Sequence, residues 1–329
     1  MRISTIQAFN TGVRGIQDNY SAATRTQEQI SSGKRILTPA DDPVASVRLL
    51  QLDQEASKLD QYKNNLTAAT NSLTQQEAVL NSVNNLLQRV REITLEAGNG
   101  ALDAGGRQAL AQELAEREDE LFGLVNSQNA RGEYLFGGFK SGSQPFVRQD
   151  DGSYIYQGDE GQRSIQIGSA RTVAINDNGK ELFVDISNAG VTQTSDDSSD
   201  DGDQSTDTVK RNVLDTVRLL REALENSSDT AADKSKRSEM LSVGLQNIDN
   251  AMNKVLGVQT SLGARLNVIE SAQLENDEAA LINAQVQSGL ADLDYAEALS
   301  RLSMQSIVLE AAQQSFVKIS GLSLFNYLR

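Results

Sequence analysis

Residues 59–90 read LDQYKNNLTAATNSLTQQEAVLNSVNNLLQRV, and this stretch decides the fold. Its apolar residues recur at alternating steps of three and four, which places them on the a and d positions of a heptad. Only Gln76 interrupts the seam. A heptad run of this length predicts a coiled-coil-like hairpin or bundle rather than an ordinary globular helix. The seam residues are Leu59, Tyr62, Leu66, Ala69, Leu73, Leu80, Val83, Leu87 and Val90.

A shorter amphipathic helix precedes this seam. Its apolar stripe runs from Ile3 to Ile30 and stops at the string Ser31-Ser32-Gly33-Lys34-Arg35. Glycine suits a helix C-terminus, and the basic pair complements the carbonyl end of the helix dipole. After a loop, Asp42 is predicted as the N-cap and Pro43 as the first residue of the next helix, because proline has no N–H to lose there.

More helices follow the seam on both sides of a β-rich insert. Gly98-Asn99-Gly100 ends the seam helix, and a third helix over 110–125 is predicted to fold back antiparallel to it. Helical periodicity returns at Val213 and, after a polar break, continues from Met240 to the C-terminus. The predicted fold class is mainly α, with long antiparallel helices from both chain ends.

At Tyr134 the apolar period changes from helical to alternating, which predicts several short strands. The segment Ser195 to Asp207 is rich in aspartate and has no apolar residue to bury, so we interpret it as a flexible surface loop. Its aspartates could bind calcium, but their spacing does not match an EF-hand loop. The predicted strands are 154–156, 164–167, 172–175 and 182–184.

Composition argues against several classes of function. Histidine, cysteine and tryptophan are absent, which removes the usual general base, the thiol nucleophile and most transition-metal ligand sets. We therefore expect no enzyme, no cofactor and no metal site. A formal net charge of −15 disfavours nucleic acid and anionic membrane surfaces as partners. Neither a membrane span nor a cleaved signal peptide is predicted, so ordinary rules would place the chain in the cytosol.

Both chain ends are poor in charge. Between Met1 and Thr24 only Arg2, Arg14 and Asp18 are charged, and the C-terminal helix from Leu302 is apolar nearly all round. Such a helix is stable only when most of its faces are buried, and one helix partner covers one stripe. We therefore expect neighbouring subunits to cover the rest, with both ends ordered only in a polymer. The predicted assembly residues are Ile3, Ile6, Phe9, Val13, Ile16, Leu302, Ile307, Leu309, Phe316, Ile319, Leu322, Leu324, Phe325 and Leu328.

The order of helices and insert resembles the flagellin superfamily, and specific strings agree with it. The string 31–36 followed by Asp41-Asp42-Pro43 looks like the N-terminal signature of that superfamily. The strings 134–138 and 154–158 are similar to the hook-filament junction family, also called hook-associated protein 3. The motif residues are Gly33, Asp41, Asp42, Pro43, Phe136, Gly137, Gly138, Arg265, Asn267, Asp294, Tyr295 and Glu297.

The resemblance implies a rod-shaped subunit of a tubular assembly. Residues 1–43 plus 285–329 would form the inner assembly domain, 44–133 plus 208–284 a helical bundle, and 134–207 the outer insert. It also implies export through the flagellar type III apparatus, and thus secretion into the extracellular flagellum. The implied partners are further copies of the chain in a ring, hook-associated protein 1, flagellin and a cytoplasmic export chaperone.

Alternatives remain open at this point. A filament-forming flagellin would share the chain ends, and a chemoreceptor-like signalling hairpin would share the long heptads. A carboxylate-dependent glycosidase in the insert is a third class, and Asp294 with Glu297 could be paired carboxylates. Helical spacing favours surface or interfacial charge for those two residues. Asp41-Asp42-Pro43 could be a subunit contact, although a helix start alone explains it.

Overall fold

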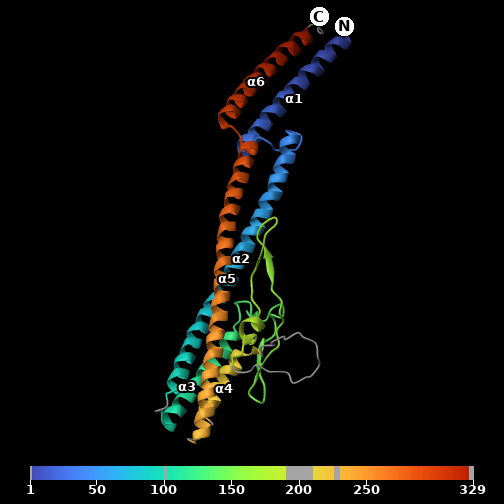
Figure 1. Ribbon diagram of the computed structural model, residues 1–329. Coiled ribbons are helices and arrows are strands. Elements are labelled where there is room, and N and C mark those ends of the chain that lie inside the picture. The colour runs from blue at the N-terminus through green and yellow to red at the C-terminus, as the bar shows by residue number, and fades with distance from the viewer. Residues whose placement is uncertain (1, 100–101, 190–209, 226–229, 326–329) are drawn as a thin grey trace, which may run out of the picture. The chain divides into compact units, whose positions relative to one another are not determined.

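The computed structural model describes residues 2–99, 102–189, 210–225 and 230–325, apart from the side chains of residues 2–6, 8 and 319–325. Long helices dominate this part of the chain, which confirms the predicted mainly α fold (Figure 1). The helices are α1 (Arg2–Ser32), α2 (Pro43–Ala97), α3 (Ala104–Val125), α4 (Val213–Glu225), α5 (Ala231–Ala291) and α6 (Tyr295–Phe325).

The chain divides into two compact units. Unit 1 comprises residues 1–60 and 276–329, and unit 2 comprises residues 61–275. Helices α2 and α5 cross this division, so each contributes one segment to unit 1 and another to unit 2. The burial of side chains in the two segments of one helix can therefore be compared directly.

Unit 2 is built on the predicted seam. The seam residues from Leu66 to Val90 are buried on α2, and four α5 residues spaced one heptad apart are buried with them. Arg89 of α2 pairs with Glu113 of α3, and Arg91 of α2 with Asp249 of α5. Helices α3 and α5 therefore both lie beside α2 and complete one core. The four α5 residues are Ile248, Val255, Leu262 and Ile269.

The insert consists of three antiparallel two-stranded sheets within the described residues. The strand pairs are β1 (Phe146–Arg148) with β2 (Tyr154–Tyr156), β3 (Ser164–Gln166) with β4 (Thr172–Ala174), and β5 (Ile186–Ser187) with β6 (Lys210–Arg211). Three of the four predicted strands are confirmed as β2, β3 and β4. The predicted acidic loop 195–207 lies outside the described residues.

The strand predicted at 182–184 is wrong. These residues belong to η1, a π-helix over Lys180–Val184 that buries Leu182 and Phe183. The side-chain oxygen of Asn178 accepts a hydrogen bond from the Glu181 N–H at 2.8 Å and starts the turn. A short apolar run has no periodicity of its own, so sequence alone does not separate a buried strand from a buried helical turn.

Three phenylalanine rings form the centre of the insert. Phe183 meets Phe136 with ring centroids 5.2 Å apart and Phe146 with centroids 5.9 Å apart, both nearly edge to face. All three rings are fully buried. Edge-to-face pairs add to the stabilisation from burial, so η1 is anchored by the same ring that sequence analysis placed on a strand.

Unit 1 brings both ends of the described chain together. Helices α1 and α6 lie side by side (Figure 1), with the Phe9 and Phe316 rings 5.0 Å apart. A Cβ atom at Gly12 would come within 2.8 Å of the Phe316 ring, so this glycine makes room for the ring. The helix predicted to run from Met240 to the C-terminus is interrupted between α5 and α6, at residues 292–294.

Candidate assembly surface and turn cluster

The turn after α1 is hydrogen-bonded to the break between α5 and α6. Gly33 accepts a bond from the Leu293 N–H at 3.0 Å, and the Arg35 N–H donates to the Ala291 carbonyl at 2.7 Å. These bonds frame an antiparallel bridge between Lys34 and Asp292. The break therefore satisfies its backbone groups by pairing with the turn rather than by continuing the helix.

Two predicted motif residues, Gly33 and Tyr295, meet at this point. Gly33 has φ +70°, a left-handed conformation that favours glycine. A Cβ atom there would also lie 2.9 Å from the Tyr295 hydroxyl oxygen. Both the backbone torsion and the close approach therefore require glycine.

Asp42 caps α2, as predicted. Its Oδ1 accepts a hydrogen bond from the Ala45 N–H at 3.0 Å, and Pro43 is the first helical residue. That hydrogen bond, together with the Arg35 guanidinium, lowers the pKa of Asp42 below its usual value. The carboxylate thus stabilises the helix start in its charged form.

Asp41 closes the loop itself. Its Oδ2 accepts hydrogen bonds from the Leu37 and Thr38 N–H groups at 2.9 and 3.0 Å, and the carboxylate forms an ion pair with Arg25 of α1. The two adjacent aspartates therefore do different work, one within the loop and one at the helix start.

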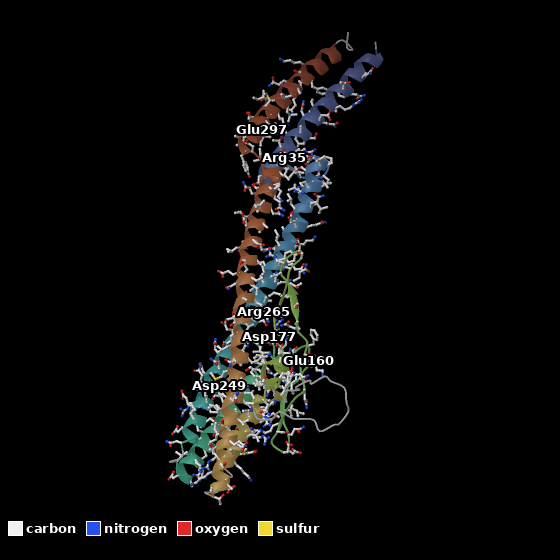
Figure 2. All side chains as sticks on the ribbon, in the orientation of Figure 1. Arg35, Glu160, Asp177, Asp249, Arg265 and Glu297 are labelled. Atoms are coloured by element: carbon white, nitrogen blue, oxygen red, sulfur yellow. The ribbon has the colours of Figure 1, made fainter. Side chains whose placement is uncertain are left out.

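Arg35 (labelled in Figure 2) connects the start of α2 with the end of α5. Its guanidinium lies 3.4 Å from Asp42 Oδ2 at the start of α2 and donates to the Leu290 carbonyl of α5 at 3.1 Å. Gln29 of α1 donates to the Arg35 carbonyl at 2.6 Å. We call this hydrogen-bonded group the turn cluster, comprising Gln29, Gly33, Arg35, Asp41, Asp42 and Leu293.

Asp294 and Glu297 have separate structural partners. Asp294 Oδ1 accepts hydrogen bonds from the Ala296 and Glu297 N–H groups at 2.9 and 3.2 Å, which makes it the N-cap of α6. Glu297 forms an ion pair with Arg301 one turn later. The Asp-x-x-Glu spacing is a helix-start signal that sequence analysis overlooked, and it would have placed the break correctly.

The predicted assembly residues fall into three groups. Val13, Ile16, Leu302, Leu309 and Phe316 are half-buried where α1 and α6 pair, and Phe9 lies at the edge of that contact. Ile307 is 63% exposed. Ile3, Ile6, Ile319, Leu322, Leu324 and Phe325 lie on α1 or α6 without described side chains, and Leu328 is outside the described residues.

Further apolar side chains of α6 are exposed beside Ile307. They spread over about half of the helix circumference, away from the stripe that contains Leu302, Leu309 and Phe316. Burying the exposed parts of these five side chains would contribute on the order of 5 kcal/mol. Unit 1 therefore leaves a large part of α6 uncovered by its own chain. The five are Leu299, Met304, Ile307, Val308 and Val317.

In unit 2, the motif residue Arg265 has a partner that explains the interrupted seam. Its guanidinium binds Asp177 through two hydrogen bonds of 2.8 and 3.1 Å (Figure 2). The buried Gln76 amide donates to the same carboxylate at 3.0 Å. The one polar residue in the α2 seam therefore ties α2 to the insert.

The glycine motif of the insert forms a tight turn. Gly138 has φ +69°, and a Cβ atom there would collide with Asp159. Asp159 Oδ1 accepts hydrogen bonds from the Phe139 and Gly161 N–H groups at 2.7 and 2.8 Å, which lowers its pKa. Gly137 approaches the Lys140 carbonyl, and the remaining motif residue, Asn267, is exposed on α5.

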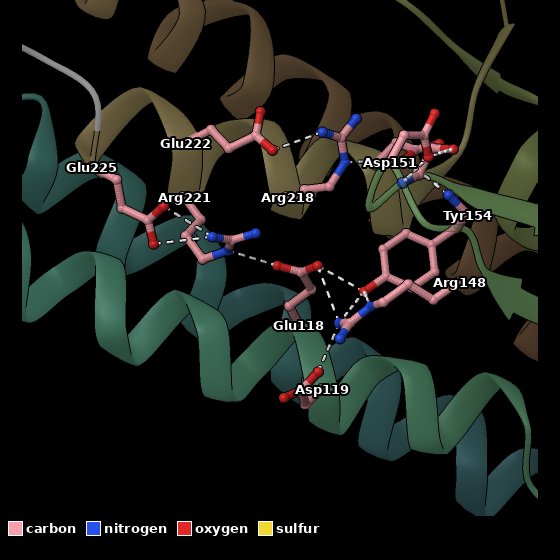
Figure 3. A network of polar contacts seen from close by, with 11 residues as sticks. Glu118, Asp119, Arg148, Asp151, Tyr154, Arg218, Arg221, Glu222 and Glu225 are labelled. Carbon is pink, nitrogen blue, oxygen red and sulfur yellow. Dashed lines mark hydrogen bonds and ion pairs between the residues drawn. The ribbon is translucent and has the colours of Figure 1, made fainter.

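A buried carboxylate joins α3, α4 and the insert (Figure 3). Glu118 is 3% exposed and accepts hydrogen bonds from the Tyr154 hydroxyl at 2.7 Å and from Arg221 at 2.9 Å. Arg148 of β1 lies 3.4 Å from the same carboxylate and 2.7 Å from Asp119. Burial and the hydrogen bond to Glu118 raise the pKa of Tyr154. The Tyr154 hydroxyl and the two guanidinium groups therefore all contact the Glu118 carboxylate.

Two negative findings concern the described part of the chain only. No group of three or more histidine, cysteine, aspartate or glutamate side chains there could hold a metal ion. Among the helices described, none combines the length and apolar character needed to cross a bilayer.

Comparison with known proteins relates both chain ends to one family. Residues 3–141 match the bacterial flagellin N-terminal helical region, and residues 245–328 match the bacterial flagellin C-terminal helical region. The chain is 26% identical to flagellin of Bacillus subtilis (strain 168) over 95% of its length and 94% of the relative's.

The hook-associated relatives are more similar than that flagellin. The chain is 30% identical to flagellar hook-associated protein 3 of Escherichia coli (strain K12) over 99% of both chains. A solved structure of a hook-associated protein from Vibrio parahaemolyticus, described as putative, superimposes with a TM-score of 0.63 at 26% identity, covering 77% of this chain and all of that one. These comparisons favour a hook-associated protein over a filament flagellin. The chain belongs to the flagellar hook-associated protein 3 family of structural proteins.

Proposed function

We propose that this chain is the subunit that joins hook to filament in a bacterial flagellum. The single observation that carries the proposal is its relation to hook-associated protein 3 over nearly the full length of both chains. The exposed apolar side of α6 supports an assembling subunit, because a soluble single copy would leave those side chains in water.

The proposal includes specific neighbours. Further copies of the chain form a ring, hook-associated protein 1 lies on the hook side, and flagellin lies on the filament side. A cytoplasmic chaperone covers the C-terminal helix before export through the flagellar type III apparatus. The exposed apolar side of α6 supports such a chaperone, since an uncovered apolar helix surface would promote aggregation inside the cell.

Electron microscopy of cells lacking this gene tests the role. The expected result is hooks without filaments, with flagellin lost to the medium, and recovery of filaments when the intact gene is restored. Normal filaments on the deletion strain would contradict the proposal.

Variants of α6 test the surface itself. Replacing Ile307 and Val317 by serine should prevent filament attachment while the thermal melt of unit 2 stays unchanged, because both residues are exposed in unit 1. Replacing the exposed polar residues Gln313 and Ser315 by alanine is the matched control and should leave attachment intact. Equal loss of attachment in both variants would argue against an apolar contact at this surface.

A further inference from the structure

The start of α2 carries an apolar patch that sequence analysis did not predict. Val44, Val47 and Leu50 are 82%, 58% and 59% exposed. Leu52 of the same segment is buried and accepts a hydrogen bond from Asn283 of α5 at its carbonyl, and Ala45, one heptad earlier, is buried too. At about 100° per residue, Val47 lies roughly 140–160° around the helix from both of them. Leu50 lies at similar angles, and Val44 about 80–100° from the same two residues. This patch, face A, therefore points away from α5 at Val47 and Leu50, with Val44 at its border.

The end of α5 carries a second patch. Leu281 and Ile282 are 70% and 55% exposed, and Val286 is 39% exposed. The buried Asn283 amide donates to the Leu52 carbonyl of α2 at 3.1 Å, which fixes the side of α5 that faces α2. Leu281 lies roughly 160° around the helix from Asn283. Ile282 lies about 100° from Asn283, and Val286 only about 60°. Leu281 and Ile282, which we call face B, therefore point away from α2, with Val286 at the border.

The two faces lie on opposite sides of one helix pair within unit 1. A two-fold contact would use one of them and leave the other in water. A contact that joins face A of one copy to face B of the next covers both, and it leaves a free face at each end for further copies. Repeated contacts of this kind generate rings or helical tubes.

Charge complements this pairing. Between residues 43 and 52 the only charged residue is Arg48, one turn after Val44 and exposed. Between residues 276 and 291 the charged residues are Asp277 and Glu278, both acidic, and Glu278 lies one turn before Ile282. The opposite charges of Arg48 beside face A and Glu278 beside face B favour A-to-B contacts over A-to-A and B-to-B contacts.

We infer that face A of one copy docks on face B of the next, so that α2 and α5 of unit 1 form a head-to-tail contact between copies. This inference rests on the proposed function. It adds a second contact between copies to the one proposed for the exposed side of α6.

Disulfide trapping tests the contact, because the chain has no cysteine of its own. Cells expressing the variant Val47→Cys, Leu281→Cys or both are used, and attached filaments confirm that the junction still assembles. Detached structures are oxidised and separated without reductant. The double variant should give a ladder of multimers, and each single variant should stay monomeric.

A control variant combines Val47→Cys with Gln54→Cys, which puts both cysteines on the face A side one heptad apart. It should stay monomeric. Dimers from this control or from either single variant would mean a two-fold contact and would overturn the inference. A monomeric double variant on cells with attached filaments would overturn the inference while leaving the proposed function intact, whereas normal filaments on cells lacking the gene would count against the function itself.

Charge reversal gives an independent measurement. Arg48→Glu or Glu278→Arg alone should reduce the cross-linked ladder about three- to ten-fold, as expected for reversing an exposed ion pair. The double reversal should restore the ladder. Single reversals that leave it unchanged would contradict the proposed charge pairing.

Discussion

Helices α2 and α5 have opposite characters in the two units. In unit 2 the α5 seam residues Ile248, Val255, Leu262 and Ile269 are buried and apolar. In unit 1 the next two positions of the same heptad are Asn276 and Asn283, which donate to the Leu59 and Leu52 carbonyls of α2 at 3.1 Å. The outward sides of unit 1 carry Val47 and Leu281 instead.

The contrast between the two seams assigns the stability of the fold mainly to unit 2 and the contacts between copies to unit 1. An apolar seam supplies most of the stability of a helix pair, whereas a buried asparagine fixes register at some cost in stability. Unit 2 therefore has an apolar core that stabilises its fold. Unit 1 has a more polar seam between α2 and α5, and its exposed apolar side chains are the ones we propose other copies cover.

The largest expected effect is on the apolar seam of unit 2. Replacing the fully buried Leu262 by asparagine should lower the free energy of unfolding by about 3 kcal/mol, because it puts an unpaired amide into a packed core. Chemical denaturation of the full chain measures this loss. Leu281→Asn, on exposed α5 in unit 1, is the matched control and should change it by less than about 0.5 kcal/mol. Equal losses would erase the distinction between the units.

A smaller effect is expected at the turn cluster. Gly33→Ala should destabilise unit 1 by about 2 kcal/mol, because of its positive φ and the nearby Tyr295 hydroxyl. Hydrogen exchange of amides in 25–60 and 285–300 reports this change. Gly15→Ala, on α1 with open space around its Cβ, should instead stabilise the helix slightly. Unchanged exchange in Gly33→Ala would show that the turn cluster does not hold unit 1 together.

Replacing a buried polar residue by an apolar one in the unit 1 seam should raise stability, whereas the reverse replacement in the unit 2 seam lowers it. Asn283 is buried, and its Oδ1 atom has no hydrogen-bond partner. Asn283→Leu should therefore slow exchange in unit 1 by an amount equivalent to about 1 kcal/mol, since leucine removes the unsatisfied oxygen. Faster exchange would mean that the amide–carbonyl bond contributes more than the buried oxygen costs.

The last expected effect, absent at neutral pH, is an alkaline loss of stability in unit 2. Burial raises the pKa of Tyr156 to about 12, and the single proton of its hydroxyl is shared between the Phe136 and Asp159 carbonyl oxygens, 2.9 and 2.8 Å away. The unfolded chain loses this proton near pH 10, so folding stability is present below that pH and falls between about pH 10 and 12. Denaturation at several pH values measures the slope. The slope should become smaller in Tyr156→Phe, and an unchanged slope would assign it to other groups.

Much of the fold follows from local sequence patterns. The heptad from Leu66 to Val90, the Asp42 cap and the strands β2, β3 and β4 could be predicted because each depends on a few neighbouring residues. The π-helix at Lys180–Val184 could not, because the rings of Phe136 and Phe146 determine it from distant parts of the chain.

The candidate surface was predicted less completely than the fold. The apolar character of α6 pointed to Ile307, but Val47 went unnoticed because the α2 seam was not extended back beyond Leu59, and Leu281 because no outward side was assigned to the helix after Met240. Extending that heptad back to Leu52 and Ala45 places Val47 on the outer side. The partners of Gln76 and Arg265 come from the insert, and no local pattern identifies them.

Hydrogen exchange along α2, compared between isolated and assembled protein, tests the central claim most directly. In an isolated copy, amides of residues 66–94 should be strongly protected and those of residues 43–58 weakly, although all lie on one continuous helix. Assembly should slow exchange in 43–58, 277–290 and 296–317 and leave 66–94 unchanged. Equal strong protection of both segments in an isolated copy would contradict the account.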